Sequence, residues 1–184
     1  MTRLALSCAA ALLAFALPGA PAAEARGPED PALIGAGDPE VIRALAAEIG
    51  TATLTADPLG DPLVRGRIGR TNYSLYFFDC REKTNDACAS IQFYAVWDVG
   101  AVKPDAAFVN VWNTEYRYCK LYLDDEQDPR LEMDVNLKYG MPAGNLRANF
   151  RLWRDCLNTF LGYMGKKLPL SPGAPSGSGG TTDL

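Results

Sequence analysis

The 184-residue chain contains no histidine. This absence excludes catalytic sites that pair serine or cysteine with histidine, and metal centres that use histidine ligands. Cysteine is also scarce, with five in the whole chain, and none has the C-x-x-C spacing typical of zinc sites. We therefore expect no metal and no cofactor. An enzyme of unfamiliar type that uses carboxylates alone is one alternative for the function.

Long apolar runs are absent except at the start of the chain. Arg3 gives a short positive start, residues 4–17 form an uncharged apolar run, and residues 18–23 combine a break with small residues. This three-part pattern is typical of a secretory signal peptide. The run has about 14 residues, whereas a helix needs about 20 to cross a membrane. We predict that residues 1–23 are cleaved and that the mature protein is periplasmic or secreted, with a retained membrane anchor as the alternative.

Positive charge is in deficit, with 18 Lys and Arg against 22 Asp and Glu and a net charge of −4. The basic residues are scattered along the chain instead of gathering on one segment. A protein that binds nucleic acid needs a basic surface to contact the phosphates. The charge balance therefore disfavours nucleic acid as a partner.

The part of the chain after residue 23 divides into one domain with two irregular ends. Residues 24–37 are rich in Ala, Gly and Pro and show no hydrophobic period, which indicates a flexible linker. Residues 168–184 contain a Ser-, Pro- and Gly-rich run that cannot bury enough apolar surface to fold, which indicates a disordered tail. Residues 38–167 are left as a single domain.

Hydrophobic periods within this domain predict both helices and strands. Helical spacing of apolar residues begins at three places, after residue 38, after residue 104 and near residue 144. The last predicted helix has one apolar stripe, formed by Leu146, Phe150, Trp153, Leu157 and Leu161. Alternating residues predict strands with one face in the core and one in solvent, which is typical of an antiparallel sheet. The predicted strands are 51–56, 63–68, 73–78, 89–97, 120–124 and 131–137. The sequence therefore predicts an α+β fold.

Four cysteines follow the predicted cleavage site, namely Cys80, Cys88, Cys119 and Cys156. An even number in an exported domain favours disulfides, and four buried thiols are the alternative. Cys80 and Cys88 lie at matching ends of a predicted hairpin, and strand parity places both on its more polar face. Cys119 lies on the core side of its strand, and Cys156 borders the apolar stripe of the last helix. We predict the pairs Cys80–Cys88 and Cys119–Cys156.

Strand parity also gathers four tyrosines on the face opposite the core residues, namely Tyr76, Tyr94, Tyr118 and Tyr122. A tyrosine-rich sheet face that is partly exposed often marks an interface. The alternative is that a helix covers this face. We treat these four residues as a candidate interaction face.

Two other segments have a structural and a functional interpretation. Asn110 and Asn113 flank Trp112, and these amides beside an indole could contact a ligand. The favoured interpretation is that Trp112 fills the core and Asn113 ends the helix. Residues 124–128 concentrate four carboxylates that could hold calcium, but they lack the glycine and the distal glutamate of an EF-hand loop. We expect a solvated acidic hairpin turn there.

Several stretches in this order resemble the YbjN domain family of bacterial proteins. They are YSLYFFDC at residues 73–80, CASIQF at 88–93, VNVWN at 109–113 and LYLDD at 121–125, within a match over roughly residues 38–164. The resemblance implies a fold similar to that of type III secretion chaperones, in which helices pack on one face of an antiparallel sheet and domains commonly dimerise. The family has no agreed catalytic residues, so the resemblance implies none here.

Together these observations predict an exported, non-catalytic binding or regulatory protein of the YbjN type. Its expected partner is a polypeptide or an envelope component recognised by the tyrosine face, and a homodimer is compatible with the resemblance. We expect no binding of nucleic acid and no membrane association after cleavage. The alternatives are the carboxylate-dependent enzyme and a purely structural dimerisation module.

Overall fold

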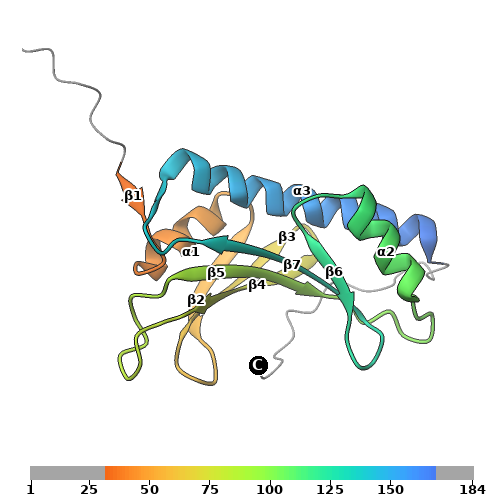
Figure 1. Cartoon of the computed structure of the whole chain (residues 1–184), viewed down its shortest axis with the longest axis horizontal. Coiled ribbons are helices and arrows are strands. Elements are labelled where there is room, and N and C mark those ends of the chain that lie inside the picture. Colours follow the sequence, from red (N-terminus) through yellow and green to blue (C-terminus); the bar gives the residue numbers. More distant parts are fainter. Residues whose placement is uncertain (1–31, 169–184) are drawn as a thin grey trace, which may run out of the picture. The chain divides into compact units, whose positions relative to one another are not determined.

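Figure 1 shows the computed structural model of the chain, which describes residues 32–168. The predicted signal peptide, most of the predicted linker and all of the predicted tail after Leu168 lie outside the described residues. The described residues contain strands and helices in the order β1, α1, β2 to β5, α2, β6 to β8 and α3. Within this part of the chain, no helix combines the length and apolar character needed to cross a membrane.

The main element is a six-stranded antiparallel sheet with the strand order β2-β3-β4-β5-β7-β6. Its strands are β2 (Thr51–Ala56), β3 (Pro62–Ile68), β4 (Thr71–Phe78), β5 (Ser90–Val96), β6 (Lys120–Leu123) and β7 (Pro129–Asn136). The helices are α1 (Pro39–Ala47), α2 (Ala106–Glu115) and α3 (Ala143–Lys167), and all three lie on the same side of the sheet (Figure 1). The predicted α+β fold with an antiparallel sheet is confirmed.

The end of the predicted linker is ordered into a small second sheet. Strand β1 (Leu33–Ile34) pairs with β8 (Met141–Pro142), and Ala36 is buried in the core. The flexible linker predicted for residues 24–37 therefore does not extend through residues 33–36. A strand of two residues is too short to show a hydrophobic period in the sequence.

The core lies between the helices and the sheet and is dominated by aromatic side chains. Trp153 of α3 is fully buried, and its ring centroid lies 5.4 Å from that of Phe93 and 6.3 Å from that of Tyr73. The stripe predicted for α3 is correct up to Leu157, but Leu161 is 37% exposed and Phe160 is buried instead. Successive buried residues of α3 are four and three positions apart in turn. A constant spacing of four would drift around a helix with 3.6 residues per turn.

Both predicted disulfides are present in the structure. Cys80 is bonded to Cys88, and Cys119 is bonded to Cys156. The predicted face of the first pair was wrong, because Cys88 is buried in the main core and Cys80 packs against it. Asp79 and Ala87 have positive φ angles of 53° and 51°. A left-handed residue breaks the alternation of side chains along a strand. The alternation within β4 and β5 therefore does not predict the face on which the cysteines lie.

Gly66 of β3 lies directly opposite Tyr73 of β4, whose ring covers it. A methyl group at residue 66 would come within 2.3 Å of the tyrosine ring. Gly66→Ala is expected to lower the free energy of unfolding by about 1–3 kcal/mol, because the buried ring must shift. Gly144→Ala is the matched control, since a methyl group there meets nothing within 4 Å. Urea denaturation measures both; equal stability of the two variants would contradict the close packing.

Candidate functional site

The sheet has a second face, opposite the helices, on which polar and aromatic side chains alternate with the core residues. Leu63, Tyr76, Tyr94 and Val96 form a small separate apolar cluster there. The rings of Tyr76 and Tyr94 meet edge to face, with their centroids 5.8 Å apart. In the part of the chain that the structure describes, no helix covers this face (Figure 1).

The structure brings together three of the four predicted tyrosines. Tyr76, Tyr94 and Tyr122 line one cavity, although Tyr76 and Tyr94 are only 8% and 5% exposed. Tyr118 lies apart from them, before β6, and is 61% exposed. Its φ angle of 76° explains the error, since the parity of β6 does not reach across a left-handed residue.

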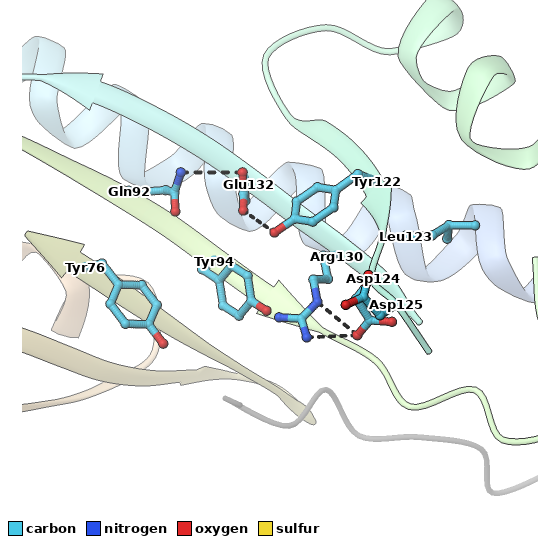
Figure 2. A pocket seen from close by; sticks show the side chains of 9 residues that line it. All are labelled: Tyr76, Gln92, Tyr94, Tyr122, Leu123, Asp124, Asp125, Arg130 and Glu132. Atoms are coloured by element: carbon cyan, nitrogen blue, oxygen red, sulfur yellow. Dashed lines mark hydrogen bonds and ion pairs between the residues drawn. The ribbon is translucent and has the colours of Figure 1, made fainter. Parts of the chain in front are cut away.

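The cavity between these tyrosines has a volume of about 320 Å³. It is formed by β4, β5, β6, β7 and the start of the turn between β6 and β7 (Figure 2). Its lining residues are Tyr76, Gln92, Tyr94, Tyr122, Leu123, Asp124, Asp125, Arg130 and Glu132. The site therefore combines aromatic rings with three carboxylates and one guanidinium.

Glu132 of β7 is a buried carboxylate at the wall of the cavity, 6% exposed. Tyr122 donates its hydroxyl hydrogen to Glu132 Oε1 at 2.5 Å, and Lys120 Nζ lies 2.6 Å from Oε2 (Figure 2 shows the tyrosine contact). Burial and this hydrogen bond raise the pKa of Tyr122 above its ordinary value, so its hydroxyl keeps the proton. The carboxylate of Glu132 is thus held by the protein's own donors.

Arg130 and Asp124 form the second charged pair of the cavity. Arg130 Nη2 lies 2.8 Å from Asp124 Oδ2, and both side chains are 15% exposed. The guanidinium carbon lies 5.6 Å from the centroid of the Tyr94 ring, within the range of a cation–π contact. Burial lowers the pKa of Arg130, but an arginine side chain remains a cation in a protein.

The hydroxyl group of Tyr94 is buried and has no hydrogen-bond partner among the described residues. The same is true of the hydroxyl of Ser74, which lies directly opposite Tyr94 on β4. Buried polar atoms without partners are rare in folded proteins, because each costs about 1–3 kcal/mol. Three other such atoms lie in the main core, on Tyr73, Trp97 and Trp153, so the Tyr94 hydroxyl is the one that a ligand in the cavity can reach.

A second hollow lies beside the cavity, between β6 and helix α2. It has a volume of about 900 Å³ and shares Tyr122, Leu123 and Asp124 with the first cavity. Its far wall comes from α2, including Val109 and Asn113. The two hollows share these three residues and so adjoin at β6, the edge strand of the sheet; together they are called the groove.

The predicted solvated acidic turn is only partly correct. Asp125 and Glu126 are exposed, whereas the Asp124 carboxylate accepts hydrogen bonds from the backbone N–H groups of Glu126 and Asp128. Asp128 is buried and pairs with Lys103 at 2.6 Å. Among residues 32–168, no group of three or more Cys, Asp or Glu side chains is placed to hold a metal ion.

Asn113 does not end its helix, because α2 continues to Glu115. Its amide instead donates to the carbonyl of Leu121 and accepts from the N–H of Leu121, both at 3.0 Å. It thereby satisfies backbone groups on the outer edge of β6. Trp112 is 1% exposed and donates to the carbonyl of Cys119, which confirms its place in the core.

Asn113→Ala is expected to lower the free energy of unfolding by about 1–2 kcal/mol, because both hydrogen bonds to Leu121 are lost. Asn110→Ala on the same helix is the control and should change stability by less than about 0.5 kcal/mol. Chemical denaturation of the two variants tests this. Equal effects would show that Asn113 does not secure the edge of β6.

The sequence interpretation missed Arg130, Glu132 and Gln92 as site residues. Their signal was present, since Glu132 alternates with the core residues of β7 and therefore shares a face with the tyrosines. What the sequence lacked was the strand order, which places β7 between β5 and β6. Only that order makes Glu132 a neighbour of both Tyr94 and Lys120.

The comparison with known families agrees with this geometry. The YbjN family, described as "Putative bacterial sensory transduction regulator", matches residues 38–165. No curated protein matches the chain at a significant level. The matched range contains the whole six-stranded sheet, both disulfides and every residue that lines the cavity. The chain therefore belongs to the YbjN family, and the resemblance seen in its sequence is confirmed.

Proposed function

We propose that the protein is an exported, non-catalytic binding protein whose groove on the second sheet face recognises a polypeptide. The observation that carries this proposal is the groove, in which the tyrosine cavity and the hollow beside helix α2 adjoin at Tyr122, Leu123 and Asp124. Small-molecule sites are usually single concave pockets, whereas an elongated groove with an aromatic end suits an extended chain. The regulator description of the family is in keeping with a binding role.

The export part of the proposal is supported by the two disulfides. Disulfides persist in oxidising compartments such as the periplasm and are rare in the cytosol. Cys119–Cys156 joins the residue before β6 to α3, so an oxidising compartment would also help to hold the edge strand that borders the groove. The signal-peptide pattern of residues 1–23 points the same way.

The charged pairs of the cavity disfavour the alternative of a carboxylate-dependent enzyme. A general acid or base must be free to exchange a proton with a substrate. Glu132 contacts Tyr122 and Lys120, and Asp124 contacts Arg130 and two backbone N–H groups. These two carboxylates are engaged in holding the site together, which supports a binding role.

Peptide binding by the purified protein tests the proposal. We expect some sequences in an immobilised library of extended peptides to bind the unmodified protein. Leu123→Arg should abolish this binding, because it places a bulky charge where the two hollows meet. Leu59→Arg is the control, since Leu59 is 75% exposed in the turn after β2, at the other edge of the sheet. Equal binding by both variants would contradict the groove as the site.

A homodimer remains part of the proposal. Strand β2 is an edge of the sheet, and its six residues carry no charge, proline or glycine. An edge of this kind can pair with a strand of another chain. Light scattering on the purified protein is expected to give twice the mass of one chain. A monomer at micromolar concentration would contradict the homodimer.

A further inference from the structure

We propose that the tyrosine cavity binds the basic side chain of the polypeptide partner, so that a lysine or arginine is required at one position of the bound segment. This inference rests on the proposed function and adds the chemistry that the partner must present. Three features of the cavity support it, namely its charge balance, one unsatisfied hydroxyl group and its aromatic walls.

The charges that line the cavity leave one carboxylate without a counter-ion. Asp124 is paired with Arg130, the one cationic residue among those lining the cavity. Glu132 is paired with Lys120, which reaches it from outside the lining. Asp125 is exposed at the rim and makes no ion pair with the described residues 32–168. A bound cation would therefore meet a net negative site.

The Tyr94 hydroxyl is a second and independent sign of a ligand. Tyr94 is 5% exposed, lines the cavity, and its hydroxyl has no hydrogen-bond partner in the described part of the chain. Figure 2 shows this hydroxyl directed along the cavity toward Arg130, away from the strand that carries it. An ammonium or guanidinium group donates hydrogen bonds and would satisfy the oxygen.

The walls of the cavity also suit the long stem of a basic side chain. Tyr76, Tyr94 and Tyr122 line the cavity with aromatic rings, which pack against methylene groups. A volume of about 320 Å³ is enough for one such side chain, not for a folded element. Leu123 lies at the junction with the second hollow, where the rest of an extended segment would continue over α2.

Titration with matched peptides tests the inference. The probes are acetyl-Gly-Gly-Lys-Gly-Gly-amide, the arginine peptide, and the norleucine peptide, which has the same length as lysine without the charge. Followed by NMR on the isotope-labelled protein, the basic peptides should bind about tenfold more tightly than the norleucine peptide. This preference should shrink as salt concentration rises.

Two pairs of variants locate the effect. Asp125→Asn should reduce the preference for lysine about fivefold, whereas Glu126→Gln, the next exposed acid in the same turn, should leave it unchanged. Tyr94→Phe should weaken lysine binding about fivefold, because it removes the hydroxyl, whereas Tyr139→Phe should not, since Tyr139 is 84% exposed and outside the cavity. Tyr94→Phe breaks no hydrogen bond within the described residues, so it is expected to fold normally.

The outcomes separate this inference from the proposed function. If lysine and norleucine peptides bind equally and Leu123→Arg abolishes both, the groove binds polypeptides but the inference about a basic side chain is overturned. Equal effects of Asp125→Asn and Glu126→Gln would also overturn it. If no peptide of any composition binds the protein, the proposed function and the inference both fail.

Discussion

Replacing both Cys119 and Cys156 with alanine is expected to lower the free energy of unfolding by about 4 kcal/mol. The disulfide closes a loop with a sequence separation of 37 residues, and without it the unfolded chain gains the freedom of that loop. Both cysteines are buried, so the truncated side chains also leave unfilled space. Guanidinium denaturation of the oxidised protein and the double variant measures the difference.

The Cys80–Cys88 pair is the internal control for this prediction. Its sequence separation is 8 residues, and the same loop-entropy relation gives about 2.5 kcal/mol for its removal. The larger loss should therefore belong to Cys119–Cys156, which joins the residue before β6 to α3. An equal loss for both pairs, or a larger one for Cys80–Cys88, would contradict the view that Cys119–Cys156 is the main covalent support of the fold.

Trp153→Ala is expected to cost about 3–5 kcal/mol of stability, the usual range for removing a large aromatic side chain from a core. Trp153 is fully buried between Phe93 and Tyr73, and its indole N–H has no hydrogen-bond partner in the described structure. The loss therefore comes from packing alone. This residue joins α3 to the middle of the sheet, so its removal should weaken the whole domain.

Leu161→Ala on the same helix is the control for Trp153→Ala. Leu161 is 37% exposed, and alanine is a good helix former, so the change should cost less than about 1 kcal/mol. Thermal unfolding followed by circular dichroism compares the two variants. A similar decrease in melting temperature for both would contradict the placement of Trp153 at the centre of the core.

Much of the fold could be predicted because its elements have clear periods. The alternation in β4, β5 and β7 separates core from outer residues correctly, and Asp38 with Pro39 marks the start of α1. Both cysteine pairs followed from element positions. The errors occur where a local backbone conformation overrides the period, as at Asp79, Ala87 and Tyr118, all with positive φ.

The candidate site was harder to predict than the fold because it depends on contacts between distant strands. Parity placed Tyr76, Tyr94 and Tyr122 on one face, but their common cavity requires β7 to lie between β5 and β6. Glu132 and Arg130 belong to the site only through that order. A crossover of this kind leaves no local trace in the sequence, since each strand has the same alternating pattern.

The role of Asn113 shows the same limit on a smaller scale. An asparagine near the end of a helical pattern is commonly a cap, and the sequence supported that interpretation. The structure uses its amide to satisfy the outer edge of β6, eight residues later in the chain. Only the packing of α2 against that edge could reveal this contact.

The most direct test of the central claim is site-specific photo-crosslinking in intact cells of the native host. A photoreactive amino acid at residue 123, where the two hollows of the groove meet, should form a discrete covalent adduct with another polypeptide. The same amino acid at exposed residue 59 should not form that adduct. An adduct of equal yield at both residues, or none at residue 123 with the protein present in the envelope, would contradict polypeptide recognition by the groove.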